Sequence, residues 1–504
     1  MPSTHLAIDL GAESGRVIVG TLDAGRLSLH EAHRFRHLPV PTPAGLCWDL
    51  TGLWRHILDG LRAAGEYCAA EGLTPESVGV DTWGVDFALL SKQGVLLGLP
   101  RCYRDPAFDD AFDRVTQRLE PRAIYEATGI QLMALNSLYQ LEARYTQEPE
   151  LFDSGGTSGG GSLHFMPDLL HHLLSGVATV ERTIASTSQM VDARTGDWNR
   201  GLLQQLGLPD AMLRTPVDPG TVIGPITPEV AAATGLPASV RVVLPPGHDT
   251  ACAVAAVPTE PNSSWCYLSS GTWSLLGAEL DAPRIDDATA AANFTNELGV
   301  TGTVRFLKNI SGLFLVQEVR RDLQRRGDDL DYPELTALAG EAEPGRCLVP
   351  VADPAFARLG DAASRLQRYA RQTGQPVPET PGQLVRACLD SLALEYRRTL
   401  AQLESLLGRT FDVLHVVGGG GKNQLLNQLA ADATGKPVVV GPEEATAAGN
   451  VLVQAIGCGH LPDLTAARRV VRDSTELSRV EPSGTDFTGS AERYAALPAV
   501  DDGA

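Results

Sequence analysis

The sequence predicts an α/β fold in two domains, and three observations support this prediction. With 504 residues, the chain is longer than the ~100–200 residues of a typical domain, so two or three compact units are expected. Short apolar strands alternate with amphipathic helices, as in sheets that are covered by helices. A strand, a glycine-containing turn and a second strand occur at residues 7–20 and again at 267–277. This weak internal repeat indicates two domains of related plan.

The elements of the N-terminal half follow from apolar runs between polar turns. Strands are expected at residues 5–9, 17–21, 27–31, 77–81 and 85–90. Residues 51–71 space their apolar side chains as a helix does, until Gly72 ends the run. The first and fourth of these strands each end in an acid, Asp9 and Asp81.

Two segments of unusual composition interrupt this pattern. Residues 154–162 consist only of glycine, serine and threonine. No lysine and no leading strand accompany them, so a flexible surface loop is expected rather than a phosphate-binding loop. Residues 209–246 contain eight prolines and few long apolar runs. This second segment is interpreted as a crossing between the two domains.

The C-terminal half shows a second α/β pattern. A strand at 240–244 opens it, and a long amphipathic helix is expected at 383–407. A strand, a glycine turn, a helix capped by Asn423, a strand and a helix then follow at residues 413–417, 418–421, 423–434, 437–440 and 443–456. This order is typical of nucleotide-binding α/β domains. The predicted domains are residues 1–240 and 241–460, followed by a weakly patterned, loosely structured tail at 461–504.

Composition argues against two classes of partner. The chain is 43% hydrophobic and 20% charged, which is typical of soluble globular proteins. Its 41 Lys and Arg residues are outnumbered by 61 Asp and Glu residues, so the formal net charge is −20. Such a surface repels nucleic-acid phosphates and anionic lipids, and no basic cluster offsets it. Neither nucleic acid nor a membrane is an expected partner.

Features linked to location indicate the cytoplasm. No window approaches the ~18 consecutive apolar residues of a membrane helix. The first residues lack the cationic and apolar stretches of a signal peptide. The eight cysteines are scattered, with no Cys-x-x-Cys pair. Isolated thiols of this kind are expected in a reducing compartment, as small buried residues.

Three glycine turns, each after a predicted strand, have donors that could bind phosphate. Residues 11–16 offer backbone N–H groups, a serine hydroxyl and an arginine, and residues 269–272 offer similar donors. Residues 418–421 precede a helix, whose N-terminus favours anions. A tight hairpin would explain any one turn, but the three together predict a nucleotide site. The last turn does not match a Walker A loop, and no dinucleotide-binding Gly-x-Gly-x-x-Gly opening is present.

Two aspartates are candidates for phosphoryl transfer, which needs positioned charge, a metal ion and a group that aligns the attacking hydroxyl. Asp249 follows a Pro-Gly turn at a predicted strand end, where its carboxylate could orient a hydroxyl and accept its proton. Its neighbours His248 and Thr250 add hydrogen-bonding groups suited to a polyol. Asp9 points into the first turn and could hold Mg²⁺ through water. Taken singly, Asp249 is better explained as a turn or cap residue.

From about His5 to Ile456, the chain resembles the FGGY carbohydrate kinases. The stretches that carry the resemblance are residues 7–16, 80–87, 247–250, 267–274, 307–313, 416–420 and 423–428. Residues 80–87 and 307–313 are most similar to the family members that phosphorylate L-rhamnulose. The resemblance implies an α/β fold of two actin-like (ribonuclease H-like) domains with the active site in the cleft between them. The N-terminal domain would lie on the sugar side and the C-terminal domain on the nucleotide side.

The resemblance also implies individual contacts. ATP would contact Ala12, Glu13, Ser14, Gly15, Arg16, Thr272, Gln317 and Gly419. The sugar would contact Gly84, His248, Asp249, Thr250 and Asn309, with Asp249 as the base. Gly84, Asn309 and Gln317 rest on the resemblance alone. Trp83 could stack on a sugar face, although packing in the core is the favoured interpretation.

Two positions depart from the family's pattern. Glu13 is an acid in a turn that should face phosphates, so it is expected to point away or to reach Mg²⁺ through water. Cys388 has no obvious partner, because Ala430 and Thr434 occupy the helix after the glycine turn. No disulfide is therefore carried over from relatives.

The activity implied by the resemblance is transfer of the γ-phosphate of ATP, with Mg²⁺, to the 1-hydroxyl of L-rhamnulose in L-rhamnose breakdown. The expected partners are this sugar and ATP, and the expected state is a monomer or small homo-oligomer. Three alternatives stay open: a kinase for another ketose such as L-fuculose or xylulose, a sugar-responsive regulator, and a non-catalytic scaffold. A regulator of this kind would carry N-terminal DNA-binding helices, whereas the first strand is expected from His5. Asp249 and the three glycine turns argue against a scaffold.

Overall fold

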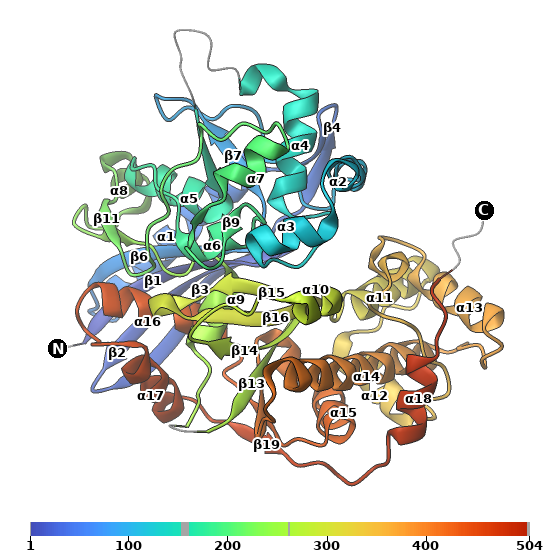
Figure 1. Ribbon diagram of the computed structural model, residues 1–504. Coiled ribbons are helices and arrows are strands. Elements are labelled where there is room, and N and C mark those ends of the chain that lie inside the picture. Colours follow the sequence, from blue (N-terminus) through green and yellow to red (C-terminus); the bar gives the residue numbers. More distant parts are fainter. Residues whose placement is uncertain (1, 153–160, 261–262, 501–504) are drawn as a thin grey trace. The chain divides into compact units, whose positions relative to one another are not determined.

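The computed structural model describes residues 2–152, 161–260 and 263–500 (Figure 1). The chain folds into two compact units, each made of segments that are discontinuous in sequence. The first unit comprises Met1–Ala256, Glu279–Phe306 and Ala445–Ser474, and the second comprises Val257–Ala278, Leu307–Glu444 and Thr475–Ala504. The predicted α/β class is confirmed, since each unit combines a mixed sheet with helices.

The first unit is built on a six-stranded sheet in the order β11-β12-β6-β1-β2-β3. Its strands are β1 (Ser3–Leu10), β2 (Ser14–Asp23), β3 (Arg26–Arg36), β6 (Pro75–Thr82), β11 (Val222–Pro225) and β12 (Arg241–Val243). Every residue of β1 is buried, because this strand lies in the interior of the sheet and is covered on both faces. The predicted opening meander of three strands is confirmed, with β1 antiparallel to β2 and β2 antiparallel to β3.

Short strand pairs and helices complete the first unit. The further strands are β4 (Pro39–Thr42), β5 (Gly45–Trp48), β7 (Phe87–Leu90), β8 (Ser162–Phe165), β9 (Val191–Asp192), β10 (Asp197–Trp198) and β15 (Thr295–Leu298). The helices are α1 (Leu50–Ala70), α2 (Ala107–Arg118), α3 (Pro121–Thr128), α4 (Ser137–Gln147), α5 (Met166–Ser175), α6 (Arg182–Ser186), α7 (Arg200–Gln205), α8 (Pro228–Thr234), α9 (Asp249–Ala255), α10 (Asp287–Ala292), α16 (Ala445–Gly457) and α17 (Leu464–Ser474).

The second unit repeats part of this plan. The seven-stranded sheet has the order β15-β16-β14-β13-β17-β18-β19. Besides β15, which is counted with the first unit, its strands are β13 (Trp265–Ser270), β14 (Ser274–Leu280), β16 (Val304–Ile310), β17 (Val413–Val417), β18 (Val438–Val440) and β19 (Ser478–Val480). β13 pairs antiparallel with β14 and parallel with β17, which pairs parallel with β18. The strands β2-β1-β6-β12 of the first unit have the same sequence of directions. The internal repeat expected from the two hairpins is therefore visible in the strand topology.

The helices of the second unit are α11 (Phe314–Arg326), α12 (Tyr332–Glu341), α13 (Ala362–Gln372), α14 (Pro381–Leu407), α15 (Gln424–Thr434) and α18 (Thr488–Ala495). The long helix expected at 383–407 is α14, which begins with a capping box between Thr380 and Gln383. The predicted cap of α15 is also confirmed, because the Asn423 side chain accepts from the N–H of Leu426. Among the described residues, no helix is both long and apolar enough to span a membrane.

Two expectations about the chain's path are wrong. The proline-rich segment 209–246 does not cross between units, because β11 pairs with β12 and β12 pairs with β6 inside the first sheet. The segment after Gly459 is more regular than expected, since it forms α17, β19 and α18 before residue 501. Residues 153–160 of the glycine-serine segment and residues 501–504 lie outside the described residues.

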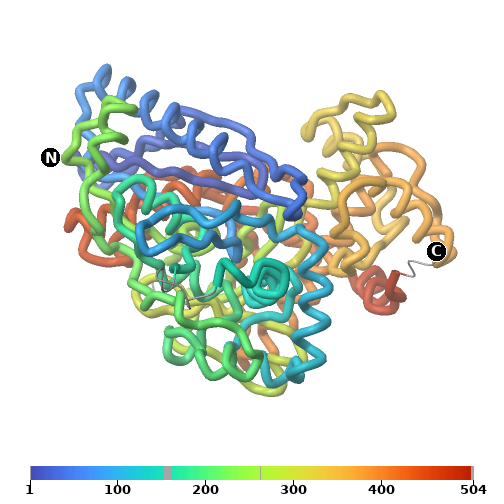
Figure 2. The backbone as a smooth tube through the Cα atoms, turned by 90° about the horizontal axis from the view of Figure 1, so that it is seen from above, coloured from blue at the N-terminus to red at the C-terminus, as the bar shows by residue number. Residues whose placement is uncertain are grey.

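Distant parts of the sequence meet in the first unit. The red helices α16 and α17 lie beside blue N-terminal strands, with α16 against β1 and α17 against β3 (Figures 1 and 2). Compactness also places residues 241–256 and α17 in this unit. The two units are discontinuous in sequence. The domain boundaries at residues 240 and 460 therefore stay predictions.

Candidate active site

Three aspartates gather at strand ends in the first unit. Asp9 and Asp81 are register partners on the parallel strands β1 and β6. The N–H of Thr82 donates to the carbonyl of Gly247 at 2.9 Å, which fixes the loop before α9 beside the end of β6. Asp249, the first residue of α9, interacts electrostatically with Asp9 and Asp81. The carboxyl ends of parallel strands are where α/β sheets place ligands.

Asp249 keeps its side chain partly open to solvent. Its Oδ1 accepts from the N–H of Thr250 at 2.5 Å and from the Thr250 hydroxyl at 3.1 Å. Burial raises the pKa of Asp249, and the negative charge of Asp9 raises it further. His248 lowers the pKa, but the net shift is upward. A carboxylate with a raised pKa and a partly open side chain is suited to accept a proton.

The imidazole ring of His248 contacts a buried carboxylate through its Nδ1. Nδ1 lies 3.1 Å from Oε2 of Glu297 on β15, and Oε2 also accepts from Arg305 Nη1 at 2.9 Å. On the other side of the ring, Nε2 lies 3.4 Å from Asp249 Oδ1. A Cβ placed on Gly84 would be 3.4 Å from the same Nε2, so the glycine backbone borders this edge of the ring.

The backbone beside Gly84 is conformationally restricted. Val85 has φ of 69°, a left-handed conformation that is strained for a β-branched residue. Its N–H donates to the Thr187 hydroxyl at 3.1 Å, and its carbonyl accepts from the Ser137 hydroxyl. These contacts hold the turn after Trp83 in one shape.

Trp83 packs in the interior, as the favoured interpretation expected. Its ring is 5% exposed and lies 4.2 Å from the ring of Trp48, centroid to centroid. The indole N–H groups of both tryptophans donate to Oδ2 of Asp86, at 2.9 and 2.7 Å. Burial raises the pKa of Asp86 to about 7, although these donors work against the shift.

The first glycine turn is closed by a hydrogen bond from the N–H of Gly11 to the carbonyl of Ser14 at 3.0 Å. His37 Nε2 lies 2.8 Å from the Gly11 carbonyl and supports the turn from β3's end. Ala12, Glu13 and Ser14 are half-buried and Gly15 is buried. A Cβ at Gly15 would lie 2.4 Å from the Phe35 ring, so packing alone already requires a glycine at this position.

Arg16 differs from the simplest expectation. Its Nη2 donates to Asp9 Oδ2 at 2.5 Å, so the guanidinium is engaged by a carboxylate within its own hairpin. The Arg16 side chain remains 18% exposed against 6% for Asp9. The pair therefore presents both a cation and an anion at the same turn.

The second and third glycine turns meet in the second unit. A Cβ at Gly420 would lie 2.1 Å from the Ser270 hydroxyl, and one at Gly418 would lie 3.1 Å from the Ser270 carbonyl. Gln317 on α11 donates from Nε2 to the Thr272 hydroxyl at 3.2 Å. At Gly419, no described atom lies within 4 Å of a Cβ position, so the backbone there is open. Asn309 lies near the end of β16 and is half-buried.

The predicted site residues thus form two groups, one in each unit. The first group is Asp9, Ala12, Glu13, Ser14, Gly15, Arg16, Gly84, His248, Asp249 and Thr250, and the second is Thr272, Asn309, Gln317 and Gly419. Sequence reasoning missed Glu297 and Arg305, which no local motif marks. Asp81 had a signal, because it ends a strand as Asp9 does, but it was given no role.

The donor chemistry of the first group fits Mg²⁺. Carboxylate oxygens are the ligands that this ion prefers, and it commonly binds one or two of them and retains water. Asp81 is wholly buried, its Oδ2 accepts from Asn450, and in the described part of the chain its Oδ1 has no hydrogen-bond partner. No set of three or more His, Cys, Asp or Glu side chains in that part is arranged as a direct metal cage. A water-mediated site is the arrangement that agrees with both observations.

Comparisons with known proteins agree with this chemistry. The model of the N-terminal domain of the FGGY family of carbohydrate kinases matches residues 4–256, and that of the C-terminal domain matches residues 266–458. A rhamnulokinase from Bacteroides thetaiotaomicron is 44% identical, with 96% of this chain and 96% of the relative covered. A rhamnulokinase from Pectobacterium carotovorum is 40% identical, with 98% and 96% covered.

Solved structures share the fold at low sequence identity. A gluconate kinase from Lactobacillus acidophilus has a TM-score of 0.76 at 15% identity, with 99% of this chain and 96% of that chain covered. A xylulose kinase from Rhodospirillum rubrum has a TM-score of 0.73 at 20% identity, with the same coverage. The two-domain α/β architecture of sugar kinases is therefore the fold of this chain.

Proposed function

The chain belongs to the FGGY family of carbohydrate kinases and is an ATP-dependent sugar kinase, and from this premise we propose that its substrate is L-rhamnulose. The reaction transfers the γ-phosphate of ATP to the 1-hydroxyl, giving L-rhamnulose 1-phosphate and ADP in L-rhamnose degradation. The observation that carries the proposal is the similarity, over nearly the full chain, to relatives named rhamnulokinase at 36–44% identity.

In the proposed mechanism Asp249 aligns the 1-hydroxyl and accepts its proton as the oxygen attacks the γ-phosphorus. Its position at the first residue of α9, with Oδ1 fixed by Thr250, supports this role. The sugar is held by Gly84, His248, Asp249, Thr250 and Asn309. Because Nε2 of His248 lies 3.4 Å from Asp249, one ketose can reach both side chains with neighbouring hydroxyls.

ATP is proposed to contact Ala12, Glu13, Ser14, Gly15, Arg16, Thr272, Gln317 and Gly419. The open backbone at Gly419 and the Gln317–Thr272 hydrogen bond support a nucleotide contact in the second unit. Asp9 would hold Mg²⁺ through water, and the bound ion would neutralise phosphate charge. The pairing of Arg16 with Asp9 keeps the guanidinium at this turn, where it can turn toward phosphate.

Cytoplasmic location is part of the proposal. All eight cysteines are free thiols in the described chain, and seven are buried. Burial raises the pKa of Cys68 to about 11 and that of Cys347 to about 11, so these thiols stay protonated and unreactive at neutral pH. Such thiols suit a reducing compartment.

The first test is sugar-dependent ADP release by the purified protein with ATP and Mg²⁺. The panel is L-rhamnulose, L-fuculose, L-ribulose, D-xylulose, L-xylulose and glycerol. The expected result is a clear preference, by kcat/KM, for L-rhamnulose. Preference for another ketose would overturn the substrate and leave the kinase activity. ATP binding without turnover of any sugar would favour the non-catalytic regulator or scaffold.

A further inference from the structure

A buried chain of charged side chains stands behind His248. Arg305 on β16 is wholly buried, and Glu297 on β15 has a side chain only 5% exposed. Oε2 of Glu297 accepts from Arg305 Nη1 at 2.9 Å and lies 3.1 Å from His248 Nδ1. Burial alone would raise the pKa of Glu297, but Arg305 and His248 outweigh it, so the net shift is downward and the group is a carboxylate.

The geometry requires a proton on Nδ1 of His248. The Glu297 carboxylate has no proton to give, so an unprotonated Nδ1 would place two lone pairs 3.1 Å apart. Arg305 Nη1 is farther from Nδ1, at 3.3 Å, and already donates to the carboxylate. A proton on Nδ1 therefore satisfies the shorter contact. The ring is then fixed with Nε2 at the edge bordered by Gly84 and Asp249.

We propose that Glu297, held in place by Arg305, is a positioning residue for the kinase reaction. It accepts from Nδ1–H of His248 and so fixes the orientation of the ring, so that Nε2 meets a hydroxyl of the ketose beside the hydroxyl aligned by Asp249. This inference rests on the proposed function, because it assigns His248 to the sugar. The role is specificity and alignment for a polyol, and Glu297 itself does not touch the reacting atoms.

The energetics favour orientation over stability as the consequence of this arrangement. A buried ion pair contributes little net stability, because the desolvation of both charges offsets their attraction. Arg305 is also incompletely paired, since its Nη2 has no partner in the part of the chain that the structure describes. An arrangement that leaves a buried donor unused stabilises the fold weakly, whereas it restrains the imidazole from the side opposite the sugar.

The primary test is Glu297→Gln, which preserves shape and removes the charge. We expect kcat/KM for the sugar to fall about 10- to 100-fold, the magnitude seen when the partner that orients a metal-binding histidine is lost. KM for the sugar should rise while KM for ATP stays within about two-fold, because His248 is assigned to the sugar alone. An unchanged sugar KM in the folded variant would overturn the inference.

A second variant distinguishes the positioning of His248 from the balance of buried charge between Glu297 and Arg305. Glu297→Gln leaves Arg305 as an unpaired buried cation, which destabilises the fold by itself. The double variant Glu297→Gln with Arg305→Met removes both charges and is expected to recover thermal stability. The sugar KM should remain raised in the double variant, because His248 still lacks its carboxylate. Recovery of the normal sugar KM would show that only charge balance mattered and would overturn the inference.

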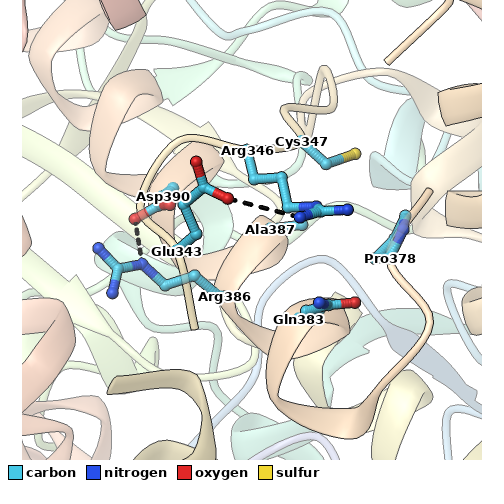
Figure 3. Close-up of a pocket in the computed structure, with 8 residues that line it drawn as sticks. All are labelled: Glu343, Arg346, Cys347, Pro378, Gln383, Arg386, Ala387 and Asp390. Carbon is cyan, nitrogen blue, oxygen red and sulfur yellow. Dashed lines mark hydrogen bonds and ion pairs between the residues drawn. The ribbon is translucent and has the colours of Figure 1, made fainter. Parts of the chain in front are cut away.

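A matched control breaks a similar pair in the second unit. Asp390 and Arg386 lie on α14, with side chains 4% and 9% exposed, and Arg386 Nε donates to Asp390 Oδ1 at 2.7 Å (Figure 3). Oδ2 of Asp390 also accepts from the N–H of Gly345 at 2.7 Å. Asp390→Asn should lower thermal stability and leave both KM values unchanged. An equal rise of the sugar KM in this control would assign the Glu297 effect to general destabilisation and overturn the inference.

A measurement independent of turnover keeps the inference and the proposed function distinguishable. In protein labelled with ¹⁵N-histidine, the His248 signals are assigned by their loss in His248→Gln. Wild-type His248 is expected to be protonated at Nδ1, and Glu297→Gln should shift or broaden that signal. An unprotonated Nδ1 in the wild type would overturn the inference even if L-rhamnulose is turned over. Wild-type protein inactive on every sugar but with Nδ1 protonated would overturn only the function.

Discussion

The pKa of the Asp249 carboxyl group is set by influences that act in opposite directions. Burial and the charge of Asp9 raise its pKa, whereas His248 lowers it. Thr250 fixes one carboxylate oxygen with two hydrogen bonds, and the side chain stays 29% exposed. The second oxygen is thus available to a hydroxyl group, and the carboxylate is a stronger proton acceptor than an exposed aspartate.

Replacement of this carboxylate is the direct test of its role. Asp249→Asn should lower kcat by about 10²–10⁴, because an amide keeps the size and the bond from Thr250 but cannot accept the hydroxyl proton. Steady-state ADP release with the preferred ketose measures the effect. Calorimetric binding of ATP serves as the control and should be unchanged. A turnover close to that of the wild type would remove Asp249 from the role of base.

The candidate site residues that sequence reasoning could propose without a resemblance are those whose neighbours are local. Asp249, His248 and Thr250 are consecutive, and the first glycine turn is one hairpin, so a short stretch reveals each of them. Glu297 reaches His248 across 49 residues of sequence. The role proposed for it depends on a tertiary contact, and a glutamate in a strand has no signature of its own.

At the scale of the element, the packing of α9 against α16 positions Asp249. A Cβ at Gly449 on α16 would lie 1.8 Å from the carbonyl oxygen of Cys252 on α9, so the two backbones are in contact at this point. The apolar pattern predicted a helix at 443–456 but not its partner. The hairpins and long helices were predictable because capping, glycine and apolar spacing are local signals. The return of α16 to β1 depends on packing that no short window contains.

This contact makes a prediction about stability. Gly449→Ala should lower the free energy of unfolding by about 1–3 kcal/mol or more, because the methyl group overlaps backbone that cannot rotate away. Urea unfolding followed by circular dichroism measures the change, and kcat should fall with it as α9 shifts.

Gly340 on α12 provides the matched control for Gly449. In the described chain, no atom lies within 4 Å of a Cβ placed there. Gly340→Ala should raise stability by about 0.5–1 kcal/mol, since alanine is the better helix former in open space. Equal effects of the two substitutions would contradict the close approach of α9 and α16.

At the scale of the whole molecule, the two units share a strand plan but differ in what their strand ends carry. The order β2-β1-β6-β12 has the same directions as β14-β13-β17-β18. In the first unit the two central strand ends carry Asp9 and Asp81, whereas in the second the corresponding turns carry hydroxyl groups and glycines. One strand plan thus carries carboxylates at its strand ends in the first unit and potential anion donors in the second, which is the division of roles that the proposed function assigns to them.

The first unit also buries histidines in neutral form, which links the stability of the molecule to pH. Burial lowers the pKa of His171 to about 3, and those of His5 and His164 to about 4. His171 must be neutral to serve its contact, because its Nε2 accepts from the N–H of Val80 at 2.9 Å. The histidine is unprotonated in both the folded and the unfolded state above pH ~6.5, so its contribution is complete there. As the pH falls below this value, protonation favours the unfolded chain.

His171→Gln isolates this effect, because glutamine can still accept from Val80 but does not titrate. The measured quantity is the free energy of unfolding of the wild type minus that of the variant. As the pH is lowered from about 6 to 4, this difference should fall by about 1.4 kcal/mol for each pH unit. Urea unfolding at a series of pH values measures this difference. Groups with opposite linkage, such as Asp86 with its raised pKa, are present in both proteins and cancel. A difference that stays constant with pH would mean that His171 accepts a proton in the folded state, and its burial would then not control its charge.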